Sequence, residues 1–202
     1  MSLPLQIGVT GGIGSGKSMV CQVFACLEIP VYYADSRAKW LTNHDSGIRE
    51  KVTALLGNEA YDSEGLYNTS FVASVVFKDA ELLNSLNAII HPVVMRDTQL
   101  WVAHHANSPY VLKEAAIMKA AGQGNALDYV IMVESPEDLR VKRILQRDNR
   151  SEPEIRAIMK RQVSDEVRKE IADFMITNDE TSALIPQVLQ LHQRFLEEAK
   201  NR

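Results

Sequence analysis

The sequence predicts an α/β fold in which a parallel sheet of five strands is flanked by helices. Three observations support this prediction. Short apolar segments alternate with segments of helical spacing, a glycine-rich segment follows the first of them, and one long interval lacks any strand-like segment. Strands that alternate with helices pair in parallel and leave helices on both faces of the sheet. The predicted strands lie near residues 5–10, 29–33, 109–114, 128–134 and 173–177.

The glycine-rich segment, residues 11–18, reads GGIGSGKS and matches the P-loop pattern G-x-x-x-x-G-K-[ST]. Its glycines let backbone N–H groups approach phosphate oxygens, and the helix that follows adds the positive end of its dipole. We expect Lys17 to be catalytic at the β- and γ-phosphates and the Ser18 hydroxyl to ligate Mg²⁺. The sequence therefore predicts a P-loop NTPase fold that uses ATP and Mg²⁺. The residues expected to contact the nucleotide here are Gly11, Gly12, Ile13, Gly14, Ser15, Gly16, Lys17, Ser18 and Met19.

The interval 36–108 contains helical patterns but no convincing strand. A connection of about seventy residues is far longer than a simple crossover between strands. We therefore expect a helical subdomain inserted between the second and third strands, and in P-loop kinases such an insertion usually holds the phosphate acceptor. The remaining residues, 1–35, 109–139 and 166–202, would form the core of a single P-loop kinase domain that includes the insertion and a lid.

The region 140–161 is basic. Eight positive side chains stand against three acids, which leaves a local charge of +5 in a chain whose net charge is −4. Arg140, Arg143 and Arg147 share one helix face because they are spaced i, i+3 and i+7. A helix–turn–helix pattern over 140–165 predicts a mobile lid that carries these arginines beside the P-loop. The alternative is an ordinary solvated, charged surface.

Two carboxylates stand at the ends of predicted strands. Asp35 follows the second strand, and Glu114 ends the third. Ligands bind outside the carboxyl ends of parallel strands, so Asp35 could accept the proton of an acceptor hydroxyl as a general base. The alternative for Asp35 is an N-cap of the next helix. Glu114 could hold Mg²⁺ directly or through water and contribute to substrate binding, or it could be a surface glutamate.

Composition limits the function classes. Hydrophobic residues make up 46% of the 202 residues and charged residues 24%, as in ordinary globular proteins. The negative net charge argues against non-specific nucleic-acid binding. The sequence shows neither a run of about 18 apolar residues nor a signal-peptide pattern, so we expect no membrane association and a cytoplasmic location. The sequence leaves a monomer and a small homo-oligomer both open.

Several segments together resemble the dephospho-CoA kinase family. After TGGIGSGKS comes a strand ending in AD, and five further segments follow along nearly the whole chain. They are LNAIIHP (86–92), PYVL (109–112), the KR-x-x-QRD match (142–148), MKRQ (159–162) and ITN (176–178). The P-loop alone occurs in many families, whereas its combination with AD and HP is more specific.

The resemblance implies transfer of the γ-phosphoryl group of ATP to the 3′-hydroxyl of dephospho-CoA, which gives ADP and coenzyme A in the last step of coenzyme A synthesis. It implies that Asp35 faces the acceptor hydroxyl and that His91 lies in the acceptor-binding subdomain. Arg143, as a catalytic residue, and Arg147 would lie in the lid near the ATP phosphates, and Asn178 near the adenine. For His91 the alternative is a helix-boundary residue fixed by the following proline.

The chain departs from the family pattern at two places. Met19 stands where most members have threonine, which would remove a hydroxyl contact to the α-phosphate. In the segment 115–120, Ala116 and Ala120 stand where many members have a proline and an acid, so an acid expected near the acceptor is absent.

Three other functions remain open. The nearest is a P-loop kinase that acts on a nucleoside or a nucleoside monophosphate. A GTPase switch is suggested by DSEG at 62–65, although no guanine-specific [NT]-K-x-D motif is present. An ATP-binding module without catalysis is the third, and the departures at Met19 and Ala120 prompt it.

Overall fold

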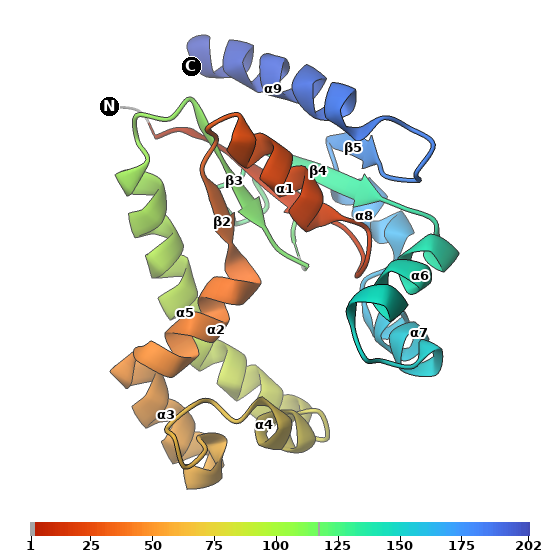
Figure 1. Ribbon diagram of the computed structural model, residues 1–202. Coiled ribbons are helices and arrows are strands. Elements are labelled where there is room, and N and C mark those ends of the chain that lie inside the picture. The colour runs from red at the N-terminus through yellow and green to blue at the C-terminus, as the bar shows by residue number, and fades with distance from the viewer. Residues whose placement is uncertain (1–2, 117) are drawn as a thin grey trace. The chain divides into compact units, whose positions relative to one another are not determined.

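The computed structural model describes residues 3–116 and 118–202. Five strands form one sheet in the order β2-β3-β1-β4-β5, and every neighbouring pair is parallel (Figure 1). The strands are β1 Leu5–Thr10, β2 Val31–Tyr33, β3 Tyr110–Glu114, β4 Tyr129–Glu134 and β5 Phe174–Thr177. The predicted α/β fold is confirmed, and the predicted strands were correct to within two residues. Strand β2 begins later than predicted because Ile29 belongs to the turn after the first helix, where its N–H is bonded to Phe24 O.

The α-helices follow β1, β2, β4 and β5, and among the described residues the interval between β3 and β4 holds none. They are α1 Lys17–Cys26, α2 Ala34–His44, α3 Ser46–Leu56, α4 Thr69–Val76, α5 Ala80–His104, α6 Glu137–Arg147, α7 Glu152–Arg161, α8 Asp165–Ile171 and α9 Leu184–Lys200. A short 3₁₀ helix, η1, spans Asn58–Ala60. Among the described residues, no helix is both long enough and apolar enough to cross a membrane.

The chain divides into two compact units, which we describe separately. The nucleotide unit contains the sheet and comprises the chain up to Tyr33 and from Val102 onward. The helical unit is Ala34–Trp101.

The core of the nucleotide unit lies between the sheet and two helices, α1 and α9. Alternate residues of β1, such as Ile7 and Val9, are fully buried against apolar side chains that include Phe24 of α1 and Phe195 of α9. The rings of Phe24 and Phe195 both pack edge-on against Tyr110 of β3. Because β1 is the central strand and all six of its residues are buried, the loop that follows it starts from a fixed point.

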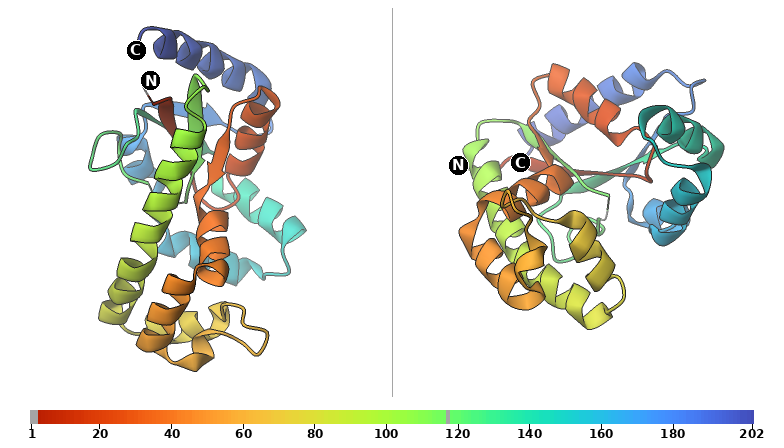
Figure 2. Two further views of the ribbon diagram at one scale, coloured as in Figure 1. Left: turned by 90° about the vertical axis from the view of Figure 1, so that its left-hand side faces the viewer. Right: turned by 60° about the horizontal axis from the view of Figure 1, so that its bottom comes forward.

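The core of the helical unit is built around the first half of α5, with α2, α3 and α4 gathered beside it (Figure 2). Arg37 of α2 joins α5 through two hydrogen bonds to Asp97, of 2.8 and 2.7 Å. Pro92 lies inside α5, so the alternative that His91 marks a helix boundary is wrong. The helix continues through the proline because Ile89, Ile90 and the valines that follow pack into the same apolar cluster on both sides of it.

One polar contact is embedded in the core of the nucleotide unit. The Tyr110 hydroxyl lies 2.6 Å from Nδ1 of His192 in α9. Burial raises the pKa of Tyr110, so its hydroxyl keeps its proton. Burial also lowers the pKa of His192 below its ordinary value of 6.5. The folded state therefore favours an uncharged His192.

This contact makes stability depend on pH. The unfolded chain takes up a proton at His192 near the ordinary pKa, whereas the folded chain resists it, so stability is fully present above that pKa and is lost as the pH falls towards the lower folded-state pKa. We expect the melting temperature of the wild type to fall towards that of His192→Gln between about pH 7.5 and about pH 5.5. Thermal unfolding of the two proteins across this range measures it. A difference that does not change with pH would contradict the neutral imidazole.

Candidate nucleotide-binding site

The P-loop follows directly from the central strand and leads into α1. Gly14 and Gly16 have φ angles of 78° and 96°, a left-handed conformation that side chains other than glycine rarely adopt. A Cβ atom at Gly16 would also lie 2.1 Å from Nδ2 of Asn178. Helix α1 then begins at Lys17, with Ser18 and Met19 exposed in its first turn. The loop therefore has the strand–glycine-loop–helix context that phosphate binding requires.

Lys17 and Glu114 lie together beside this loop. The Lys17 ammonium donates to Gly11 O at 3.0 Å and lies 3.8 Å from Glu114 Oε1. Strand register explains the meeting, because Val9 of β1 pairs with Glu114 at the end of β3. Glu114 is 8% exposed, so the alternative that it is a surface glutamate is wrong. The Lys17 ammonium and the Glu114 carboxylate therefore lie side by side next to Gly11 of the P-loop.

Two other residues predicted from the sequence, Arg143 and Asn178, meet at the same loop. Arg143 of α6 donates through Nη2 to Asn178 O at 3.2 Å and to its Oδ1 at 3.3 Å. The Asn178 amide in turn donates to Ser15 O of the P-loop at 2.9 Å. The basic helix and the turn after β5 are thus tied to the phosphate-binding backbone.

The turn that carries Asn178 is fixed by Asp179. Its carboxylate accepts from the backbone N–H groups of Ser182 and Thr181 and from the Thr181 hydroxyl. These bonds, that from the Ser182 N–H first, lower the pKa of Asp179 to about 2. The turn therefore stays ordered by an ionised side chain at neutral pH.

Arg147 differs from its neighbour on α6. Its side chain is 63% exposed and pairs with Asp148, with Nε 2.8 Å from Oδ1. The structure thus links Arg143 to the P-loop through Asn178 and leaves Arg147 at the surface with an acid beside it.

Sequence reasoning did not give Gln162 a role. The P-loop N–H of Ile13 donates to Gln162 Oε1 at 2.9 Å, just after α7. The Ile13 side chain packs against a small apolar cluster of α6 and α7 that includes Ile144 and Ile155. The segment MKRQ resembles the family pattern, but the sequence gives no indication of the group to which a glutamine just after a helix bonds.

Asp35 and His91 belong to the helical unit. Asp35 is the second residue of α2, inside its first turn, so it is not the residue that precedes and caps the helix. An acid in that position stabilises the helix dipole. His91 is an exposed residue of α5, next to Pro92, which lines a cavity of about 480 Å³ together with Leu41 and Leu100. Of the segment 115–120, residue 117 lies outside the described residues.

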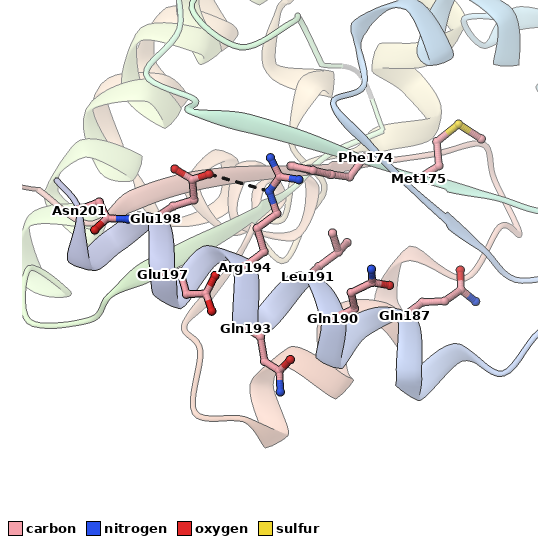
Figure 3. A pocket seen from close by; sticks show the side chains of 10 residues that line it. All are labelled: Phe174, Met175, Gln187, Gln190, Leu191, Gln193, Arg194, Glu197, Glu198 and Asn201. Carbon is pink, nitrogen blue, oxygen red and sulfur yellow. Dashed lines mark ion pairs between the residues drawn. The ribbon is translucent and has the colours of Figure 1, made fainter.

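A cavity of about 730 Å³ also lies in the nucleotide unit, between β5 and α9 (Figure 3). Arg194 of α9 stands over the Phe174 ring at 4.6 Å and pairs with Glu198 at 3.9 Å. The other side chains that line it are mostly amides and acids of α9, and it includes no P-loop residue. Size alone therefore does not identify the site, whereas the P-loop backbone does.

The comparisons with known proteins agree with this geometry. A family model described as dephospho-CoA kinase matches residues 5–183. A dephospho-CoA kinase of Chlorobium chlorochromatii (strain CaD3) is 38% identical over 207 residues, which cover 99% of this chain and 98% of that protein. A dephospho-CoA kinase of Bacteroides fragilis (strain YCH46) is 36% identical over 189 residues, covering 94% and 92% of the two chains.

Solved structures show the same fold. TT1252 from Thermus thermophilus superposes with a TM-score of 0.81 at 26% identity, covering 98% of each chain. Dephospho-CoA kinase from Campylobacter jejuni superposes with a TM-score of 0.61 at 20% identity, covering 96% of this chain and 98% of that one. With a family model matched over most of its length and relatives above 30% identity across nearly all of it, this chain belongs to the dephospho-CoA kinase family.

Proposed function

We propose that this chain transfers the γ-phosphoryl group of ATP to the 3′-hydroxyl of dephospho-CoA, giving ADP and coenzyme A. The P-loop, with Lys17 beside Glu114 at its mouth, is the observation that carries the kinase activity. Membership of the dephospho-CoA kinase family supports the acceptor, in preference to a nucleoside or nucleoside monophosphate.

In the proposed reaction the 3′-oxygen of the acceptor forms a bond to the γ-phosphorus. The bond from that phosphorus to the β,γ-bridging oxygen breaks, and its electron pair stays on ADP. Asp35 accepts the proton of the attacking hydroxyl as a general base. Lys17 and Arg143 stabilise the charge that develops on the phosphate oxygens. The protein thus contributes position and charge rather than covalent chemistry.

The donor set fits Mg²⁺. This ion is usually held by one or two protein oxygens together with nucleotide phosphates and water. The Ser18 hydroxyl and the Glu114 carboxylate would supply those oxygens, and the bound ion would neutralise charge on the β- and γ-phosphates. Within the residues that the structure describes, no three His, Cys, Asp or Glu side chains form a complete metal site. A site completed by the nucleotide itself agrees with that finding.

The remaining assignments follow the same proposal. His91 and the helical unit would bind the acceptor, and residues 140–165 would close over the nucleotide as a lid, with Arg147 moving towards the phosphates and Asn178 near the adenine. The backbone N–H groups of the P-loop, Met19 included, would replace the hydroxyl contact of the usual threonine. We place the enzyme in the cytoplasm, as a monomer or a small homo-oligomer without nucleic-acid or membrane partners.

The GTPase alternative has no support in the fold. The segment DSEG at 62–65 lies in the helical unit between η1 and α4 and does not follow a strand of the sheet along the chain. Asp62 Oδ1 accepts from the N–H groups of Glu64 and Leu66, so this carboxylate closes its own turn.

The proposed acceptor is tested by ADP release from Mg·ATP with dephospho-CoA, AMP or adenosine as the added acceptor. We expect strong stimulation by dephospho-CoA, with coenzyme A as the product. Stimulation by AMP or adenosine instead would show that this compound, and not dephospho-CoA, is the acceptor. No stimulation by any of the three would favour an ATP-binding module without catalysis.

Lys17→Ala should lower the turnover number at least a hundredfold, because it removes a preorganised cation from the developing phosphate charge. The same ADP-release assay measures the change, and thermal unfolding shows whether the protein remains folded without the lysine beside Glu114. Lys200→Ala, an exposed lysine at the end of α9, is the matched control. Near-normal turnover by Lys17→Ala would refute the proposed mechanism.

Asp35→Asn should lower the turnover number about a hundredfold and leave the affinity for Mg·ATP unchanged, because the amide keeps the shape of the side chain and cannot accept the proton. Steady-state kinetics and direct ATP titration separate the two effects. Unchanged turnover would reduce Asp35 to a helix-stabilising residue of α2.

A further inference from the structure

Two buried arginines lie beside Gly12 of the P-loop in the nucleotide unit. Arg140 of α6 is 7% exposed and Arg168 of α8 is 3% exposed. Asp165 bridges them, with Oδ2 3.2 Å from Arg140 Nη2 and Oδ1 2.8 Å from Arg168 Nη1. The sequence placed Arg140 among the arginines of the predicted lid beside the P-loop, and it gave Arg168 no role.

The charges of this cluster do not balance. Two guanidinium groups share one bridging carboxylate, so the three side chains carry one surplus positive charge. Within the part of the chain that the structure describes, neither arginine has a hydrogen-bond partner for its Nε atom. Removing a charged donor from water without a partner is costly, so the cluster is suited to receive an anion.

The position of the cluster indicates which anion. A Cβ atom on Gly12 would lie 1.9 Å from Arg140 Nη1 and 3.5 Å from Arg168 Nη1, so both guanidinium groups approach the P-loop at a residue that has no side chain. The Lys17 ammonium lies 3.5 Å from Gly12 O. Three cations therefore converge on the Gly11–Gly12 part of the loop, where Lys17 is expected to meet the β- and γ-phosphates.

We propose that Arg140 and Arg168, oriented by Asp165, bind oxygens of the terminal phosphates of ATP. This proposal rests on the proposed function and adds two nucleotide-binding residues to it. Guanidinium groups bind phosphate through paired N–H groups, and the unpartnered Nε atoms supply the donors for such pairs.

The test compares the dissociation constants of Mg·ATP, Mg·ADP and AMP by calorimetric titration of the full chain. Arg140→Met should weaken ATP binding about tenfold or more, ADP binding less, and AMP binding not at all, because a charge-assisted bond to a terminal phosphate is lost. Lys142→Met is the matched control, since Lys142 is an exposed cation on the same helix, and all three affinities should stay unchanged.

If Arg140 had a purely structural role, its substitution would weaken the binding of ATP, ADP and AMP equally. Equal weakening of ATP, ADP and AMP, or no weakening of any of them, would overturn the proposal. Should Arg140→Met fail to fold, Arg140→Lys keeps the charge without the paired donors. The proposal then requires that Arg140→Lys weaken ATP binding more than ADP binding and leave AMP binding unchanged. The titrations need no acceptor, so a wild type that binds ATP but does not phosphorylate dephospho-CoA would refute the proposed function and leave this comparison intact.

Discussion

The nucleotide site depends on how the backbone of the P-loop is held. Glycines make the loop possible, but they also leave it without side chains that could fix it from within. The structure supplies the missing contacts from distant parts of the chain, with Gln162 binding the Ile13 N–H and Asn178 binding Ser15 O. A loop held in this way is preorganised for phosphate, so little ordering remains when the nucleotide binds.

The same contacts relate the basic helices to the chemistry. Helix α6 reaches the loop through Arg143, which bonds to Asn178, and through Ile144, which packs against Ile13. If α6 and α7 move as a lid, these contacts must either break or move the P-loop and Asn178 with the helices. Phosphate binding and closure of the helices would then be coupled through the Arg143–Asn178 hydrogen bonds and the packing of Ile144 on Ile13.

Much of this architecture could be predicted from the sequence. The strands can be predicted from the sequence because central parallel strands are buried on both faces and therefore appear as short apolar runs. The P-loop and Glu114 followed from motif and position. Asn178 came from the family resemblance, and the structure gives it a physical reason in its bond to the P-loop.

The rest depended on tertiary contacts that the sequence does not encode locally. A buried arginine such as Arg168 and an exposed one such as Arg147 look alike in sequence, and the family resemblance pointed to Arg147, which lies at the surface. Only burial excludes a surface position for Glu114, and only the continuation of α5 through Pro92 excludes a helix boundary at His91. Helix-breaking rules are local, whereas the packing that overrides them is not.

The preorganised loop is tested most directly by the hydrogen-exchange rate of the Ile13 amide, measured by NMR without nucleotide in the wild type and in Gln162→Ala. We expect slow exchange in the wild type, since this N–H is bonded to Gln162 Oε1, and fast exchange in the variant. An Ile13 amide that exchanges in the wild type as fast as one in an open loop would contradict the account.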